Sequence, residues 1–130
     1  NGMPIDSRPV LGWMFGRGQN YSAQATGDGL GLNAKGQLIF GNGQETVTGK
    51  ANTERWKWHH AVLVRDQEKV QVYLDGKLEI SGEAKAMSNV ETLFVGGRNN
   101  KESSWEGRLD EAAVFDRALS EKEIKALFLP

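Results

Sequence analysis

The sequence predicts an all-β domain with one short helix at its C-terminus. Short β-prone segments alternate with turns rich in Gly, Asn and Asp, at intervals of roughly 8 to 12 residues. The chain contains 16 Gly and only 3 Pro, which is typical of a fold with many tight turns. About ten short strands of this kind indicate two antiparallel sheets in a β-sandwich or barrel.

Five strands are expected in the first half of the chain. Gly-rich turns such as Gly41-Asn42-Gly43 separate them. Residues 1–9 are expected to be an irregular lead-in, and residues 49–55 a polar loop. The expected strands cover residues 10–15, 21–25, 30–33, 37–40 and 45–48.

The middle of the chain carries the clearest pattern. Strands are expected over residues 58–65, 69–74 and 77–81, and Asp75-Gly76 joins the last two. Asp-Gly predicts a type I′ hairpin, because that turn needs a positive φ at both central residues. Leu74 would then face Lys77, and Tyr73 would face Leu78. One face would carry Val70, Val72 and Leu74, and the other Tyr73, Leu78 and Ile80; we expect one face in the core and the other partly covered by a loop.

Two more strands and a helix complete the prediction. The strands are expected over residues 91–95 and 109–115. Ser120 and Glu123 have the spacing of a capping box, in which each side chain bonds the other residue's amide at a helix start. Leu119 and Ile124 would form the hydrophobic staple beside it. One helical face would carry Ile124, Leu127 and Phe128, and Pro130 would end the helix.

Length and composition indicate one globular domain spanning residues 1–130. The 16 Lys and Arg nearly balance the 17 Asp and Glu, and no basic block occurs, which argues against a nucleic-acid partner. The absence of Cys excludes a disulfide scaffold, a thiolate zinc site and a Cys nucleophile. No apolar run reaches the roughly 18 residues of a membrane span.

The second half of the sequence resembles the laminin-G-like members of the concanavalin A-like lectin/glucanase superfamily. The resemblance is carried by Trp58-His59-His60, Tyr73-Leu74-Asp75-Gly76 and Val95-Gly96-Gly97, followed by Gly107 to Glu111 (GRLDE) and Arg117 to Ser120 (RALS). It is dense from Trp58 to Phe128 and weaker over residues 10–41. The resemblance implies a jelly-roll β-sandwich with a short C-terminal helix.

The same resemblance implies a setting for the domain. Members of the family normally begin with strands that precede the segment equivalent to Val10, whereas only nine residues precede it here. We therefore expect a piece of a larger chain, whose first strands are either lacking or supplied by another segment. The family also implies an extracellular or cell-envelope protein and a binding module for glycans. A protein-interaction or spacer domain is the alternative.

The adjacent acids Asp110 and Glu111 raise the question of catalysis. Neighbouring residues of a strand point to opposite faces, whereas a glycosidase needs two carboxyls about 5–10 Å apart on either side of the sugar. The glucanases of the superfamily carry Glu-x-Asp-x-x-Glu on one strand, and this pattern is absent from the sequence. We expect no enzymatic activity; a hydrolase would require two carboxylates that face each other across a cleft.

Calcium is the cofactor that the resemblance implies, because many laminin-G-like domains hold it with Asp or Asn side chains and backbone carbonyls. Calcium takes about six to eight oxygen ligands. No loop in this sequence holds a dense series of acids, so a site would combine distant loops. The candidate ligands are Asp28, Asn42 and Asp110. For Asp110 the alternative is a buried carboxylate that accepts backbone N–H bonds.

Aromatic and polar loop residues are the candidates for glycan contacts, since sugar C–H faces stack on aromatic rings. Trp58 occupies a core position of the family and is expected to pack inside. Trp105 is also more readily explained by packing, although it remains a candidate. His59 and His60 are expected to be ordinary packed or half-exposed histidines. The candidate contacts are Tyr21, Asn42, Trp56, Arg98, Asn99, Asn100 and Trp105.

Overall fold

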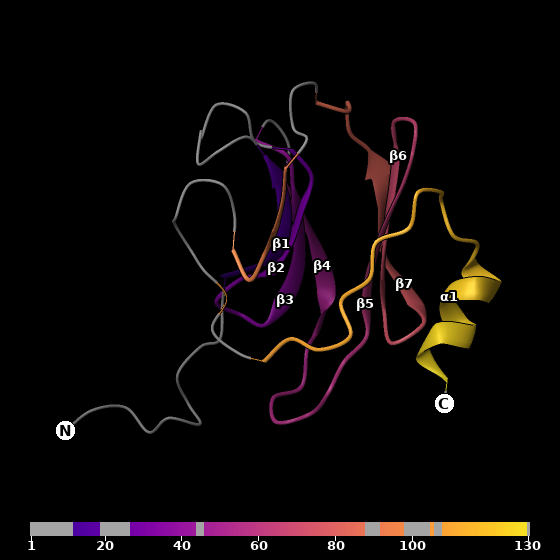
Figure 1. Ribbon diagram of the computed structural model, residues 1–130. Coiled ribbons are helices and arrows are strands. Elements are labelled where there is room, and N and C mark those ends of the chain that lie inside the picture. Colours follow the sequence, from indigo (N-terminus) through magenta and orange to yellow (C-terminus); the bar gives the residue numbers. More distant parts are fainter. Residues whose placement is uncertain are drawn as a thin grey trace.

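Two antiparallel sheets face each other in the computed structural model, which describes residues 12–18, 27–43, 46–87, 92–97, 105 and 108–129 (Figure 1). The larger sheet has the strand order β4-β3-β2-β1-β8, and the smaller has the order β5-β6-β7. Helix α1 (Glu121–Phe128) lies on the outer side of the smaller sheet. The strands are β1 (Gly12–Gly18), β2 (Gly29–Leu32), β3 (Gln37–Gly41), β4 (Thr46–Asn52), β5 (Ala61–Asp66), β6 (Lys69–Leu74), β7 (Lys77–Glu83) and β8 (Thr92–Val95).

The hydrophobic core lies between the two sheets, as the prediction of a sandwich requires. Inward side chains come from every second strand position, and full burial of one such side chain contributes about 1.5–3 kcal/mol. The buried cluster consists of Leu30, Leu32, Leu38 and Phe40 from the larger sheet, and Val70, Val72, Ile80 and Ala84 from the smaller sheet and its exit.

The β6–β7 hairpin has the predicted turn. Asp75 and Gly76 have φ angles of 50° and 80°, and the strands pair Leu74 with Lys77 and Tyr73 with Leu78. The register then shifts, because Ile80 pairs with Val72. This irregularity gives β7 one extra residue and reverses the facing of its later residues. Ile80 therefore lies in the inter-sheet core, and the prediction that it shares a face with Tyr73 and Leu78 is wrong.

The outer face of the smaller sheet is covered by a helix rather than by a loop. Ile124 of α1 is fully buried and packs with Val64 and Tyr73, with Leu119 at the margin. Burial is the leading cause that raises the pKa of the Tyr73 hydroxyl, and the nearby Glu121 carboxylate raises it further. The prediction of a loop failed because a segment far along the chain supplies the cover.

The start of α1 is the predicted capping box. The Ser120 hydroxyl accepts from the Glu123 amide, and the Glu123 carboxylate accepts from the Ser120 amide. Arg117 also donates to Glu123. This bond, followed by the amide of Ser120, lowers the pKa of Glu123 to about 2. Within the described residues, no helix is long and apolar enough to cross a membrane.

Several predicted strand limits are wrong. The strand expected over residues 58–65 begins only at Ala61, and β4 continues through residues expected to be loop. No strand forms over residues 109–115, where Glu111 has a φ of 52° that breaks an extended chain. Val114 and Phe115 are exposed instead. The strand expected over residues 21–25 lies outside the described residues.

A carboxylate joins the two sheets along the side formed by β4 and β7. Glu79 Oε1 accepts from the backbone amides of Lys50 and Ala51, at 2.5 and 2.7 Å. These amides belong to an edge strand, and a charged acceptor across them blocks pairing with another chain. The irregularity in β7 that brings Ile80 into the core adjoins Glu79.

A methyl group at Gly31 should be far more destabilising than one at Gly82. A Cβ at Gly31 would lie 2.4 Å from the Gly12 carbonyl oxygen, whereas a Cβ at Gly82 would meet nothing within 4 Å. We expect Gly31→Ala to lower the free energy of unfolding by about 1–3 kcal/mol or more. Gly82→Ala is the matched control, and urea unfolding measures both; equal losses would contradict the close strand packing at β1 and β2.

Candidate functional site

Two exposed tryptophans stand on the segment that links the two sheets. Residues 53–60, here called the tryptophan loop, connect β4 to β5 and extend beyond the strands at the lower end of Figure 1. Trp56 is 76% exposed and Trp58 is 65% exposed. The prediction that Trp58 packs in the core is therefore wrong. Trp58 precedes the start of β5, so its indole remains outside the inter-sheet layer.

Hydrogen bonds at both ends hold the tryptophan loop against neighbouring turns. At its start the Thr53 amide donates to the Gly36 carbonyl, at 2.8 Å, in the turn between β2 and β3. At its end the His60 amide donates to Asp75 Oδ1, and the Asp75 amide donates to the His60 carbonyl, both at 2.8 Å. The loop is thus attached to one turn from each sheet.

The ring of His59 crosses the interior of the loop. Its Nδ1 lies 2.8 Å from Asp75 Oδ2, and its Nε2 lies 2.7 Å from the Glu54 carbonyl oxygen. The side chain is only 17% exposed. His60 is oriented differently, because its ring stacks on Phe128 of α1 with centroids 6.1 Å apart. The His59 ring therefore links the start of the tryptophan loop to the β6–β7 turn.

Trp56 has a backbone conformation that is rare outside glycine. Its φ is 63°, in the left-handed region that costs a bulky residue about 1–3 kcal/mol. The Arg55 guanidinium lies 5.6 Å from the centroid of the Trp56 ring, a cation–π contact that favours this placement. Strained residues of this kind occur where surrounding contacts determine the backbone, often at binding sites.

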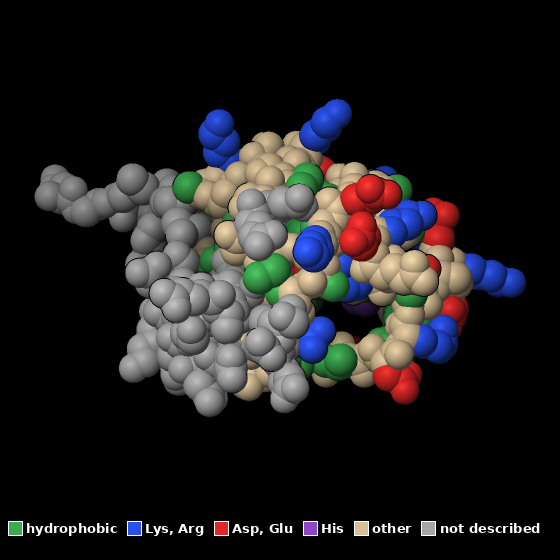
Figure 2. Space-filling model, turned by 90° about the horizontal axis from the view of Figure 1, so that it is seen from above, with side chains coloured by type: hydrophobic (Ala, Val, Ile, Leu, Met, Phe, Trp, Pro, Cys, Tyr) green, Lys and Arg blue, Asp and Glu red, His purple; other side chains and the backbone are tan. Residues whose placement is uncertain are grey.

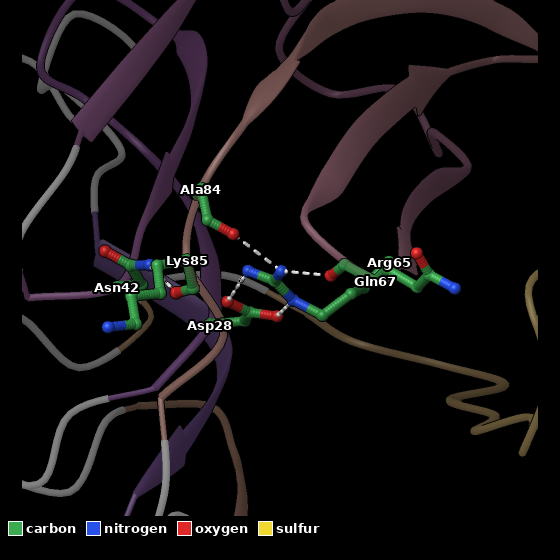
Figure 3. A network of polar contacts seen from close by, with 6 residues as sticks. All are labelled: Asp28, Asn42, Arg65, Gln67, Ala84 and Lys85. Atoms are coloured by element: carbon green, nitrogen blue, oxygen red, sulfur yellow. Dashed lines mark hydrogen bonds and ion pairs between the residues drawn. The ribbon is translucent and has the colours of Figure 1, made fainter.

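A second polar network lies near the opposite ends of the strands. Arg65 at the end of β5 donates Nε and Nη2 to the two carboxylate oxygens of Asp28, which precedes β2 (Figure 3). The remaining Nη1 donates to the carbonyls of Gln67 and Ala84, both at 2.7 Å. Asp28 is 8% exposed. One guanidinium thus ties the larger sheet to the smaller one in a largely dry environment.

Two of the predicted calcium ligands, Asp28 and Asn42, lie at the same end of β2 and β3 (Figure 3), and both are engaged by other groups of the protein. Both oxygens of Asp28 accept from Arg65, so a guanidinium supplies positive charge at the place where the sequence predicts a calcium ligand. Asn42 is fully buried and donates from Nδ2 to the Lys85 carbonyl. Asp110 is exposed and accepts from the Glu111 amide, so it is not a buried carboxylate. Among the described residues, no three His, Cys, Asp or Glu side chains are grouped to hold a metal ion.

The predicted glycan contacts in the described part of the chain lie at different places in the fold. Trp105 packs against the inter-sheet core, and its indole N–H is buried without an acceptor, so it is no exposed platform. Asn42 lies at the end of β3, away from the tryptophan loop at the end of β4. Only Trp56 is both described and exposed. Tyr21, Arg98, Asn99 and Asn100 lie outside the described residues.

The exposure of Trp58 was not predicted from the sequence, and neither were the contacts by which His59 and Asp75 position the tryptophan loop. A signal was present in Trp56-Lys57-Trp58, where two aromatics flank a charge at the end of a polar loop. The argument from strand alternation also fails for Asp110 and Glu111. Neither residue lies in a strand.

Removal of the Arg65 guanidinium should strongly destabilise the fold. In Arg65→Met the Asp28 carboxylate would be left largely buried without its partner, at a cost of about 3–5 kcal/mol. Lys57→Met is the matched control, because Lys57 pairs with Glu54 on the surface and exposed pairs contribute about 0–1 kcal/mol. Thermal and urea unfolding measure both. Similar stability of the two variants would refute the structural role of the Asp28–Arg65 pair.

The chain matches one family and shares its fold with solved structures. It superposes on an S-layer domain-containing protein from Clostridium thermocellum with a TM-score of 0.51 and 18% identity, covering 98% of this chain and 66% of that chain. It superposes on the Trypanosoma rangeli sialidase with a TM-score of 0.55 and 18% identity, covering 99% of this chain and 21% of the sialidase. This chain therefore spans only part of either protein, and at these identities the likeness concerns the fold alone. The family model described as the concanavalin A-like lectin/glucanases superfamily matches residues 9–125, so the chain belongs to the laminin-G-like family of that superfamily.

Proposed function

We propose that this domain is a non-catalytic, carbohydrate-binding module of a larger extracellular or cell-envelope protein. The observation that carries the proposal is the pair of exposed indoles, Trp56 and Trp58, on a loop held at both ends. The lectin-like family and the fold shared with an S-layer domain-containing protein support the setting.

The chemistry of the tryptophan loop suits the apolar face of a sugar ring. Indole rings bury a large area on contact and lose little side-chain entropy, because only two χ angles are restricted. The bonds of His59 and His60 to Asp75 hold the backbone beside Trp58, which lowers the entropy lost on binding. Two aromatics two residues apart can contact successive sugars of a chain or two parts of one sugar.

The absence of the Glu-x-Asp-x-x-Glu pattern from the whole sequence supports a role without catalysis. The charge balance of the chain favours neither a nucleic acid nor a strongly charged partner, since its formal net charge is −1. On the face opposite the tryptophan loop, which Figure 2 shows from above, acidic and basic side chains of the described residues are interspersed. Binding would therefore depend on shape and stacking more than on the net field.

A protein-interaction domain is the second candidate, and one observation favours it. Val114 is 75% exposed and Phe115 is 48% exposed, in the irregular segment that precedes α1. Adjacent exposed apolar side chains are typical of contact surfaces between proteins. This segment and the tryptophan loop carry different residues, so substitutions can separate the two functions.

Calcium binding is an expectation that comes from the family resemblance. Asp110 is the candidate with a solvent-exposed carboxylate. Ligand binding and thermal unfolding are therefore measured with added Ca²⁺ and with a chelator. A rise in melting temperature with Ca²⁺ that Asp110→Asn removes would establish the ion, and identical curves would exclude it.

Alanine substitution of either tryptophan should weaken glycan binding by about tenfold or more, since truncation of an aromatic anchor costs about 1–2 kcal/mol or above. A glycan array identifies the ligand, and titration calorimetry compares Trp56→Ala and Trp58→Ala with the parent. Both side chains are exposed, so the melting temperature should change little.

Val114→Ala is the matched control, because Val114 is as exposed as Trp56 but lies outside the tryptophan loop. It should bind the glycan like the parent. If the parent binds no glycan on the array, either with or without Ca²⁺, the proposed function is wrong. Loss of a protein partner in Val114→Ser and Phe115→Ser, with no glycan bound by the parent, would support the second candidate instead.

A further inference from the structure

We infer that His59 is a proton-dependent clasp, which holds the tryptophan loop closed when its imidazole is doubly protonated and releases the loop's first half when it is not. The consequence for ligand binding rests on the proposed function, whereas the clasp itself rests on the contacts of His59. The clasp consists of His59, Asp75 and the Glu54 carbonyl.

Both ring nitrogens of His59 face acceptors. Nδ1 lies 2.8 Å from Asp75 Oδ2, and Nε2 lies 2.7 Å from the carbonyl oxygen of Glu54. A backbone carbonyl and an ionised carboxylate accept hydrogen bonds and cannot donate them. A neutral imidazole carries one N–H, so it can donate to only one of these partners. The two contacts exist together only when the ring is an imidazolium.

One oxygen of the Asp75 carboxylate already accepts a hydrogen bond from the tryptophan loop. Its Oδ1 accepts from the His60 amide, which leaves Oδ2 for the His59 ring. The Asp75 side chain is 30% exposed and the His59 side chain 17%, so water competes only partly for these bonds. A hydrogen bond to a carboxylate is roughly twice as strong as one between neutral groups. On deprotonation, Nδ1–H therefore stays with Asp75, and Nε2 gives up its proton to solvent.

Loss of the Nε2 proton has a local structural effect. The Nε2 lone pair would then face the Glu54 carbonyl oxygen, and the two would repel each other. The stretch from Glu54 to Trp56 would separate from the ring, while Trp58 would stay beside the bonds of His59 and His60 to Asp75. The left-handed backbone of Trp56 would lose one of the contacts that maintain it.

The other charged groups near the clasp have partners of their own or lie on the surface. His59 and Asp75 are therefore the pair whose contact depends on protonation. In the loop, the Glu54 carboxylate pairs with Lys57 at 3.0 Å on the surface, and Arg55 lies over the Trp56 ring. From the helix, Lys125 approaches Gly76 and pairs with Glu121 at 3.2 Å. The β7 strand begins with an exposed Lys77, and His60 stacks on Phe128. Among the described contacts, Asp75 provides the one carboxylate bonded to the His59 ring.

The clasp predicts that acid closes the loop and base opens it. Closure requires the imidazolium, so the loop is closed at low pH and opens as pH rises and the ring gives up its Nε2 proton. Loss of this hydrogen bond should lower the protection of the Arg55 and Trp56 amides, measured as exchange relative to the intrinsic rate at each pH, by about fivefold. Glycan affinity would fall with rising pH over the same interval.

Asp75→Asn is the variant that separates the clasp from a purely structural contact. Asn-Gly suits a type I′ turn at least as well as Asp-Gly, so the hairpin should be retained. The introduced amide oxygen can accept from the His60 amide, and its NH₂ group can donate to His59 Nδ1. A neutral ring with its proton on Nε2 then satisfies both neighbours, and the loop should stay closed at every pH in the range.

The experiment is a pH titration of the ¹⁵N-labelled 130-residue chain by NMR, without ligand. In the parent, the His59 Nε2 signal should move downfield on losing its proton, and the Trp56 indole signal should shift with the same midpoint. His59→Gln assigns the ring signals and should abolish the Trp56 response, and Asp75→Asn should also abolish it. The far-UV circular dichroism of each variant verifies its fold.

Two results would overturn the inference. One is a His59 ring that titrates while the Trp56 signal and the protection of the Arg55 amide, relative to its intrinsic exchange rate, stay constant. The other is a Trp56 response that persists unchanged in both variants. Neither depends on a sugar, so a blank glycan array beside a positive titration would reject the proposed function and leave the clasp intact.

Discussion

The Asp75-Gly76 turn is the constraint on which the rest of the structure depends. Its positive φ angles set the register of the β6–β7 hairpin, and the Asp75 carboxylate holds the tryptophan loop through His59 and His60. The other turn residue adjoins the helix, because a Cβ at Gly76 would be in van der Waals contact with Phe128, at 3.4 Å. Sheet, loop and helix therefore meet at two residues, and a shift of the turn would displace the exposed indoles.

The two ends of the sandwich have different physical roles. At one end, the pair of Asp28 and Arg65 with two backbone carbonyls ties the sheets together in a buried environment (Figure 3). At the other end, polar contacts hold a loop whose aromatic side chains remain in solvent. Such a division lets binding residues vary on a framework whose stability is supplied elsewhere. Along the side of the sandwich, Glu79 satisfies the edge amides of β4 and joins it to β7.

Most of the architecture was predictable, and much of the site was not. Periodicity and turn residues located the described strands to within a few residues and the hairpin register near the turn, but β7 shifts one step before Ile80. That shift could not be read from the residues, since an alternating strand and an irregular one have the same composition. The family position of Trp58 predicts a core residue, yet its exposure depends on where β5 begins. The segment over residues 109–115 has a β-like pattern, but Glu111 adopts a left-handed backbone.

The sequence alone determined the fold class, the type I′ turn, the capped helix and the absence of thiol chemistry. These follow from local sterics, hydrogen bonding within a few residues and composition, which act wherever the segment lies. Only the tertiary structure decided that Arg65 neutralises Asp28, that a helix covers Tyr73, and that two tryptophans face solvent above a His–Asp contact. Each of these depends on groups far apart in the chain, and their approach is set by packing of the whole domain rather than by any local pattern.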